Sequence, residues 1–312
     1  MKANKASVVN GNSEARSQLR IGTITLLIVL SVIWGLAFVA IKLAVLQLSP
    51  VNLTLLRWFI ASPGYLLLLA FIGKPKVKFD RSDLPRLVAI SAANVPAYHL
   101  ALNAAEETVS SGLASLLVAL GPVFIVVLSF VMLREKITPR VVIALFLAVA
   151  GATVLSYGNL GATGSIIGPL EVVISALATA VFSVLSKPLV AKYGALHVAI
   201  WAGVIGTGML LPLLSASFVT QVSKLSLLGW GSVLYLSLLS TVLGYSVYYT
   251  LVSRGTLSRL SIQLYLIPIV SVVGGIYILR ESLTAYTILG GAATLGAIAI
   301  VSTRAKRNTK TD

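Results

Sequence analysis

Long apolar runs separated by short polar stretches make up most of the chain between residues 21 and 303. A helix needs about 20 mostly apolar residues to cross a bilayer. Cutting the chain at charges, Pro and Gly gives ten such runs, at 21–46, 51–72, 84–105, 110–133, 139–157, 166–188, 196–219, 228–252, 256–279 and 284–303. The pattern predicts an all-α integral membrane protein with ten transmembrane helices. The continuous runs exclude an outer-membrane barrel, whose strands alternate in polarity.

Three of the runs need comment. The third is interrupted by Asn94, Pro96, His99 and Asn103, and the sixth contains Glu171. We expect both to cross the membrane, because dropping either would break the pattern of charged loops. The first run is about 26 residues long, whereas the apolar core of a signal peptide has about 7–15 residues. We therefore expect it to be the first span.

The composition supports a membrane protein and explains the basic charge. Charged residues make up 11% of the chain, hydrophobic residues 57%, and the net charge is +15, whereas an average soluble protein is about 25% charged. Such apolar content excludes a nucleic-acid-binding protein, which needs its basic residues on a solvated face. The chain has no cysteine, which excludes disulfides, thiolate chemistry and cysteine-bound metals.

The positions of the basic residues predict an orientation. With the N-terminus in the cytoplasm, all but four of the 24 Lys and Arg residues fall in cytoplasmic tails and loops; the exceptions are Lys42, Arg57, Lys224 and Arg280. Cytoplasmic loops of membrane proteins carry this excess. We expect a multi-pass protein of the cytoplasmic membrane with both termini, residues 1–20 and 304–312, in the cytoplasm.

The chain contains an internal repeat. A shift of 146 residues aligns 113–138 with 259–284 without gaps and with nine identities, including Pro122 with Pro268 and Arg134-Glu135 with Arg280-Glu281. The repeat divides the chain into halves at 21–157 and 166–303, each with five predicted spans. Because five is odd, the second half has the opposite orientation in the membrane. Inverted repeats of this kind are typical of secondary transporters with a substrate site near the midplane.

Several short motifs also resemble one known family, the EamA-type transporters of the drug/metabolite transporter superfamily. The motifs that carry the resemblance are Trp34-Gly35 with Phe38 and Ile41-Lys42, Arg57, Leu120-Gly121-Pro122-Val123 with Leu133-Arg134-Glu135, and Tyr265-Leu266-Ile267-Pro268-Ile269 with Leu279-Arg280-Glu281. The resemblance covers residues 21–303. It implies ten helices, a central cavity lined by spans 1–4 and 6–9, and export of small metabolites or drugs. Glu106-Glu107 departs from the family pattern, in which uncharged or aromatic residues are more usual.

Polar residues inside the predicted spans are the candidate substrate-binding residues, because polar groups within a membrane usually face a cavity. His99 and Asn103 are four residues apart and so share a helix face, and the repeat maps them onto Tyr245 and Tyr249. We expect these two faces to bracket a substrate; interhelical hydrogen bonding is the alternative role. The complete set of candidates is Trp34, Tyr98, His99, Asn103, Tyr245, Tyr249, Gln263 and Tyr265.

A second set of residues is predicted to act in gating. Pro122 and Pro268 each remove a backbone N–H inside a span and kink the helix, as hinges or as static bends. Arg57 lies about two turns inside span 2 and needs a partner, for which Glu171 has the matching depth. Arg134-Glu135 and Arg280-Glu281 are expected to form ion pairs that close short loops.

Small residues at matching positions predict close packing of spans 5 and 10, either as a scaffold pair within the chain or at a homodimer contact. The small residues are Ala144, Ala148 and Gly151 in span 5 and Gly290, Thr294 and Ala297 in span 10.

Several catalytic and cofactor motifs are absent from the sequence. It has no nucleotide-binding phosphate loop, no metal-ligand spacing and no Gly-x-Ser-x-Gly elbow. We expect no enzyme activity, no cofactor and no metal, with a small-molecule substrate and membrane lipids as partners. The leading hypothesis is a secondary transporter that exports amino acids, similar amphipathic metabolites or drugs by alternating access. The alternatives are a non-transporting membrane receptor or assembly protein and a lipid-handling membrane enzyme.

Overall fold

The computed structural model describes residues 3–73, 75, 77–133, 138–253 and 263–308, which form helices and connecting turns and include no strand. The first group of helices is α1 (Ala3–Val45), α2 (Pro50–Ile72), η1 (Arg81–Asp83), α3 (Leu84–Ala92), η2 (Ala93–Ala97), α4 (Tyr98–Thr108), α5 (Ser111–Val118), α6 (Gly121–Leu133) and α7 (Pro139–Thr163). The second is α8 (Ile167–Tyr193), α9 (Ala195–Leu210), η3 (Leu211–Leu213), α10 (Ala216–Ser223), α11 (Leu227–Leu234), η4 (Tyr235–Leu243), α12 (Gly244–Ser253), α14 (Gln263–Leu279) and α15 (Ala285–Asn308).

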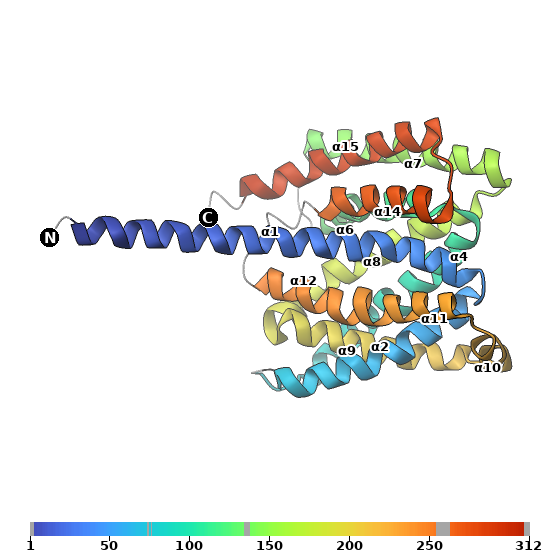
Figure 1. Cartoon of the computed structure of the whole chain (residues 1–312), viewed down its shortest axis with the longest axis horizontal. Helices are drawn as coiled ribbons and strands as arrows, with labels where there is room; N and C mark the ends of the chain where they lie inside the picture. Colours follow the sequence, from blue (N-terminus) through green and yellow to red (C-terminus); the bar gives the residue numbers. More distant parts are fainter. Residues whose placement is uncertain (1–2, 74, 76, 134–137, 254–262, 309–312) are drawn as a thin grey trace.

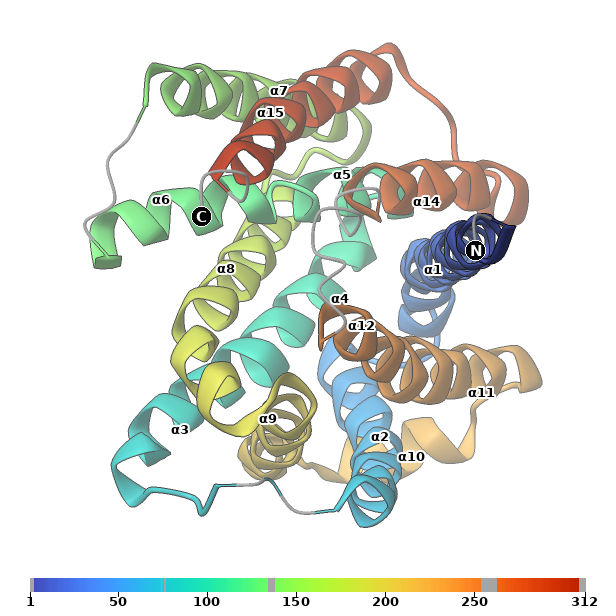
Figure 2. The ribbon, with the colours of Figure 1, turned by 90° about the vertical axis from the view of Figure 1, so that its left-hand side faces the viewer.

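The long helices lie side by side in one bundle, with α7 and α15 as a pair along one edge (Figures 1 and 2). The start of α1 and the end of α15 lie at the same end of the bundle, and α10 lies at the opposite end (Figure 1). We call the first the terminal end and the second the distal end. The prediction of an all-α protein is confirmed for the described residues.

Seven helical segments among the described residues are long and apolar enough to cross a membrane, and two more are shorter. The seven are 22–45, 50–72, 111–131, 139–163, 167–193, 195–213 and 227–248, and the shorter two are 263–279 and 285–300. Residues 84–105, the predicted third span, form α3, η2 and α4 in succession instead of one α-helix. A total of ten spans therefore stays a prediction.

The end of the seventh predicted run differs in the structure. The seventh run was expected to continue to residue 219, but α9 ends at Leu210, a short 3₁₀ turn containing Pro212 follows, and α10 is a separate helix. Proline has no N–H and clashes with the preceding turn, so it ends the helix. The first residues of the ninth run, 256–262, lie outside the described residues.

Local sequence signals explain where several helices begin and end. The Ser49 hydroxyl accepts a hydrogen bond from the Asn52 N–H, and Pro50 follows as the first residue of α2. The Ser110 hydroxyl accepts from the Leu113 N–H at the start of α5. Both are N-caps of the usual kind. Gly164 ends α7 in the left-handed region, with φ of 70°, which glycine adopts without strain.

Two segments form π-helices, η2 and η4. A shift of 146 residues places η2 on residues 239–243, the last five of η4. Single π-helical turns are rare and occur often at functional sites. The segment η2 interrupts the helical stretch of residues 84–108, and η4 interrupts the apolar segment 227–248. Carbonyl groups in such turns can accept bonds from other helices.

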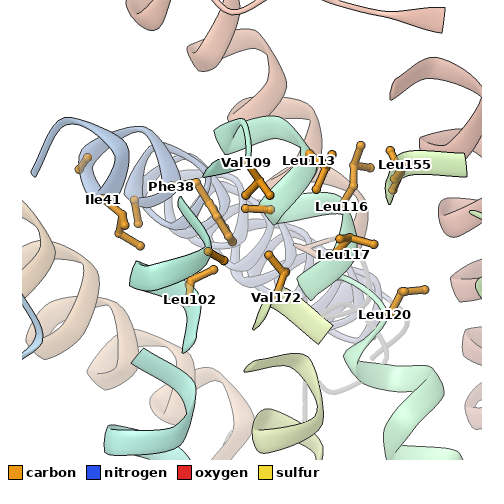
Figure 3. Packing of buried hydrophobic residues seen from close by; sticks show 14 of the residues in the cluster. Phe38, Ile41, Leu102, Val109, Leu113, Leu116, Leu117, Leu120, Leu155 and Val172 are labelled. Carbon is orange, nitrogen blue, oxygen red and sulfur yellow. The ribbon is translucent and has the colours of Figure 1, made fainter. Parts of the chain in front are cut away.

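The largest apolar cluster lies between α1, α4, α5, α7 and α8. Figure 3 shows Phe38, Leu102, Val109, Leu117 and Val172 converging from α1, α4, α5, α8 and the turn after α4. All five are at most 5% exposed. This cluster holds the distal half of α4 against its neighbours and fixes the direction in which the polar face of α4 points.

The α7–α15 pair confirms the predicted close packing of spans 5 and 10. A Cβ on Gly151 would lie 2.7 Å from the Thr294 Oγ1 and 2.9 Å from the Gly290 carbonyl oxygen. Ala144 and Ala297 are fully buried. The small residues of α7 therefore contact α15 of the same chain, which is the scaffold role; a homodimer stays a prediction.

Candidate functional site

An aromatic cluster joins α1 to the helix formed by α11, η4 and α12. The Trp34 ring centroid lies 5.4 Å from that of Tyr245 and 5.4 Å from that of Tyr248. The indole Nε1 donates to the Ser240 carbonyl oxygen at 3.0 Å. Gly244 makes this approach possible, because a Cβ there would lie 2.7 Å from Nε1. The structure thus brings together two of the predicted site residues, Trp34 and Tyr245.

Arg57 lies next to this cluster and is 4% exposed. Its Nε and Nη2 donate to the Thr241 Oγ1 at 3.1 and 2.9 Å. The Tyr65 hydroxyl donates to the Thr241 carbonyl oxygen at 3.3 Å. Two carbonyl groups of η4, those of Ser240 and Thr241, therefore accept bonds from side chains of α1 and α2. The π-helix provides these acceptors, because its hydrogen bonding departs from the regular α pattern.

The predicted ion pair between Arg57 and Glu171 is wrong. Among the described residues the ion pairs do not include either side chain. Glu171 is partly buried on α8, and the charge that acts on it is that of Glu107. Arg57 instead uses the neutral hydroxyl of Thr241, which η4 brings within hydrogen-bonding distance. A gating role of either residue stays a prediction.

The predicted polar face of α4 lies against α2. The His99 ring centroid lies 5.3 Å from that of Trp58 and 4.7 Å from that of Tyr98. The Asn103 Nδ2 donates to the Thr54 Oγ1 at 2.8 Å. His99 and Asn103 are at most 1% exposed. Two of the candidate residues, His99 and Tyr98, are thus in contact. Trp58 of α2 packs against His99.

Arg57 connects the two groups of aromatic side chains. It bonds to Thr241, whose neighbour Ser240 accepts the Trp34 bond, and the residue after Arg57 in α2, Trp58, contacts His99. The site is therefore one buried guanidinium between aromatic and imidazole side chains of α1, α2, α4 and α12. We call Trp34, Arg57, His99, Thr241 and Tyr245 the central cluster.

Three other candidates lie outside the central cluster or the described residues. Gln263 is buried at the start of α14, and among the described residues its Nε2 has no hydrogen-bond partner. Tyr265 is partly buried on the same helix, and no described contact joins either residue to the central cluster. The Tyr249 side chain lies outside the described residues. Substrate-binding roles for all three stay predictions.

The two predicted hinge prolines have different surroundings. Pro122 is the second residue of α6, and the two residues Ala119 and Leu120 separate α6 from α5. Pro268 lies inside α14, which is continuous from Gln263 to Leu279. The helix is therefore divided at the first proline and uninterrupted around the second, although the repeat makes them equivalent in sequence.

Glu281 has a role that the sequence did not predict. Its two carboxylate oxygens accept from the Ser111 N–H at 2.8 Å and the Ser111 hydroxyl at 2.9 Å. The carboxylate therefore caps the N-terminus of α5, where negative charge is favourable. The expected ion pair with Arg280 is not formed, since Arg280 is exposed with a left-handed φ of 59°. Arg134-Glu135 lies outside the described residues.

A charged cluster lies at the terminal end, between the α2–α3 connection and the end of α8. The Lys192 Nζ lies 2.8 Å from the Asp83 carboxylate and 3.3 Å from that of Asp80. The Tyr193 hydroxyl donates to Asp83 at 2.7 Å. Hydrogen bonds from Ser82 and Lys192 lower the pKa of Asp80 to about 2. Hydrogen bonds from Lys192 and Tyr193 lower the pKa of Asp83.

An apolar groove of about 620 Å³ lies on the surface between α1 and α11. Leu36, Val39 and Leu43 line one wall, and Leu228 and Tyr235 line the other. The residues of the central cluster do not line it. The groove and the central cluster are therefore separate features.

Sequence reasoning missed Trp58, Tyr65, Thr241 and Glu106 as residues of the polar interior. Trp58 adjoins Arg57 in sequence, and Tyr65 lies two turns further along α2, so a helix-face analysis of span 2 would have found Tyr65. Thr241 gives no signal, because a single Thr in an apolar run is common in membrane helices. Glu106 was noted only as a departure from a family pattern, yet it is fully buried.

Comparisons with known proteins place the chain in a family. The EamA-like transporter family matches residues 21–157 and 166–303. An uncharacterized transporter of Archaeoglobus fulgidus is 36% identical over 271 residues, which are 86% of this chain and 94% of the relative. A probable terminal-alkyne amino-acid exporter of Streptantibioticus cattleyicolor is 30% identical, over 89% of this chain and 92% of the relative.

A more distant relative is named for a related substrate class. A probable amino-acid metabolite efflux pump of Escherichia coli is 26% identical, over 86% of this chain and 90% of the relative. The family match covers most of both halves of the chain. The described residues of the chain include seven helical segments long and apolar enough to cross a membrane. A buried polar cluster lies between these helices. The chain therefore belongs to the EamA-like transporter family and is a multi-pass membrane transporter, not an enzyme.

Proposed function

We propose that this transporter exports amino acids or similar amphipathic metabolites across the cytoplasmic membrane by alternating access. The observation that carries the proposal is the central cluster, in which one buried guanidinium lies among aromatic side chains. Two relatives support the substrate class, since one is named a probable terminal-alkyne amino-acid exporter and another a probable amino-acid metabolite efflux pump.

The chemistry of the cluster suits a substrate with one carboxylate and an apolar part. A guanidinium presents a planar set of donors that matches a carboxylate. In the structure the Arg57 Nε and Nη2 both bond to one neutral hydroxyl, that of Thr241, which a carboxylate could replace as acceptor. The Trp34 and Tyr245 rings supply an apolar surface. Strongly anionic substrates such as sugar phosphates fit poorly, because they need several positive charges.

Two inverted repeats of five helices, 21–157 and 166–303, are part of the proposal. Two observations support these repeats. The 146-residue shift aligns η2 with the end of η4, and α7 packs against its repeat equivalent α15. The different surroundings of Pro122 and Pro268 also support the proposal, because the two halves adopt different states during alternating access. The charge distribution supports cytoplasmic termini.

The test is counterflow in proteoliposomes. Vesicles loaded with unlabelled phenylalanine should take up radiolabelled phenylalanine from outside, with a saturable rate and competition by other apolar amino acids. Competition by glucose 6-phosphate should be weak. Vesicles that show no saturable counterflow with phenylalanine or with any other apolar amino acid would contradict the proposal.

A matched pair of glycine variants tests whether the central cluster is the site. Gly244→Ala places a methyl group against the Trp34 indole, whereas Gly231→Ala, earlier in the same span, meets nothing within 4 Å. We expect Gly244→Ala to reduce counterflow by about tenfold or more, the effect of about 1.4 kcal/mol on a rate, and Gly231→Ala to leave it unchanged. Equal activity of the two variants would place the site elsewhere.

A further inference from the structure

One face of α4 carries three buried polar side chains whose hydrogen-bonding capacity is not fully used. His99, Asn103 and Glu106 follow one another at intervals of four and three residues, and so share a face. All three are at most 1% exposed. Among the described residues, both ring nitrogens of His99, the Oδ1 of Asn103 and both carboxyl oxygens of Glu106 have no hydrogen-bond partner. Native proteins rarely leave buried polar atoms in this state.

Glu106 is the most costly of the three to bury. It lies in the last turn of α4, and Leu102 and Val109 on either side of it belong to the apolar cluster of Figure 3. The start of α8 closes the region, because Gly168 packs against Thr108 and Val109. A carboxylate without hydrogen-bond donors in such surroundings is strongly disfavoured relative to the neutral acid. The arrangement therefore fits a protonated Glu106.

Lys42 of α1 lies beside Glu106 but is not paired with its carboxyl group. The Lys42 Nζ donates to the carbonyl oxygens of Glu106 at 2.5 Å and Val109 at 2.9 Å. A cation at this position stabilises the C-terminal end of α4. The ion pairs of the described residues do not include one between Lys42 and Glu106. The ammonium thus holds α1 against α4 through backbone carbonyls.

The other ionisable groups around Glu106 have partners of their own or lie further along the helices. Glu281, after α14, acts on Glu106, but both its oxygens accept bonds from Ser111. Tyr98, on the same helix, interacts electrostatically with Glu106. Glu107 points away, is exposed, and acts on Glu171 of α8. Among the residues that the structure describes, Lys42 is therefore the cation available to an ionised Glu106.

We propose that Glu106 is a proton-binding site that couples transport to the proton gradient, an inference that rests on the proposed transport function. In the closed arrangement seen here Glu106 holds one proton. When the terminal end opens, water reaches the carboxyl group and the proton leaves to the cytoplasm. The carboxylate left behind attracts the Lys42 ammonium from the carbonyls of residues 106 and 109, which loosens α1 from α4. When the distal end opens, a proton from the outer side binds, neutralises Glu106 and restores the α1–α4 contact, so that one proton enters for each substrate exported.

Proteoliposomes with and without a pH gradient test this assignment. We expect wild-type protein to raise the concentration of radiolabelled phenylalanine inside the vesicles to about ten times the outside concentration when the pH differs by about one unit across the membrane. This ratio is the limit for one coupled proton. Glu106→Gln should retain counterflow at equal pH and lose the gradient-driven accumulation. Glu107→Gln, which changes the adjacent exposed carboxylate, should behave as wild type.

The outcomes separate the two proposals. Counterflow without any response to the pH gradient in wild-type protein, or an unchanged response in Glu106→Gln, would overturn the role of Glu106 and leave the transport function standing. A wild-type protein with no counterflow of any apolar amino acid counts against the proposed function.

A chemical probe of the wild-type protein avoids dependence on a folded variant. Dicyclohexylcarbodiimide adds to a protonated carboxyl group in an apolar environment, and the adduct can be located by peptide mass spectrometry. We expect the adduct on Glu106 and not on Glu107, with a yield that falls as the pH is raised. An adduct on Glu107 alone, or a yield at Glu106 that does not change with pH, would contradict the proposal.

Discussion

Arg57 is a buried positive charge whose nearest acceptor is a neutral hydroxyl. A buried charge is strongly destabilising unless hydrogen bonds compensate for the lost hydration. Here Thr241 accepts two donors of the guanidinium, and its own hydroxyl donates to the Leu236 carbonyl oxygen at 2.8 Å. Thr241 thus connects the charge to the backbone of η4 through a short chain of hydrogen bonds.

Thr241→Val should lower the stability of the protein. Valine has the same shape but cannot accept the Arg57 bonds, and an unsatisfied buried donor costs about 1–3 kcal/mol. The measurement is thermal unfolding in detergent, with Thr220→Val as the control, since Thr220 lies exposed on α10. A variant as stable as the control would mean that water or another group satisfies Arg57.

At the scale of helices, the α7–α15 pair shows what small residues contribute. Gly151 and Gly290 let the two backbones approach until a Cβ on Gly151 would lie 2.9 Å from the Gly290 carbonyl oxygen. Small residues allow this in membranes, where dispersion and weak polar contacts replace the hydrophobic effect between helices.

Gly151→Ala should therefore separate the pair and destabilise the protein by about 1–3 kcal/mol, the usual cost of overpacking. Gly161→Ala is the matched control, because a Cβ at that position of the same helix meets nothing within 4 Å. Comparison of the two thermal unfolding midpoints gives the result. Equal midpoints would show that α15 can move away without loss.

The contact between the α2–α3 connection and the end of α8 should depend on pH. The pKa of Asp80 is about 2 and that of Asp83 is also lowered, whereas an unfolded chain has an Asp pKa near 3.9. The carboxylates therefore stabilise the fold above about pH 4, and this contribution is lost as the pH falls toward about 2. Both groups are at the surface, so the effect is modest.

Asp83→Asn should lower the unfolding midpoint at neutral pH and reduce its fall between about pH 5 and pH 2. Glu107→Gln, at the distal end, should keep the wild-type pH dependence. If the unfolding midpoint of Asp83→Asn falls with pH as steeply as that of the wild type, the acid sensitivity belongs to other carboxylates.

Sequence patterns predicted the helices well and the π-helical segments not at all. Apolar runs locate a membrane helix because the bilayer requires a continuous apolar length. A π-helical turn leaves that length almost unchanged, so η2 and η4 have no periodic signature. The contact of Arg57 with Thr241 depends on η4, which explains why depth alone selected Glu171 as its partner.

For the whole molecule, the repeat and the charge bias were readable because they are spread over many residues. The packing of spans 5 and 10 followed from spacing. The central cluster was found in part, since Trp34, His99, Arg57 and Tyr245 stood out as polar or aromatic residues in apolar runs. Which of them meet was not predictable, because that depends on helix rotation and on bends at η2 and Pro122.

The orientation of the whole molecule can be tested with single cysteines, because the chain has none of its own. Lys78→Cys and Lys224→Cys place a thiol on exposed residues in the α2–α3 and α10–α11 connections. We expect a membrane-impermeant maleimide to label Lys224→Cys in intact cells and Lys78→Cys only after permeabilisation. The reverse pattern would invert the proposed topology.

The π-helix η2 has a consequence for the chain's tolerance of length changes. A π-helix accommodates one residue more than an α-helix over the same path, and each residue turns an α-helix by about 100°. Loss of one residue within Ala93–Ala97 should therefore restore regular α geometry there and leave the helix beyond it in place, with His99, Asn103 and Glu106 still directed at α2 and α1. Loss of one residue from the regular helix α3 has no such compensation and would turn the whole polar face by about that angle.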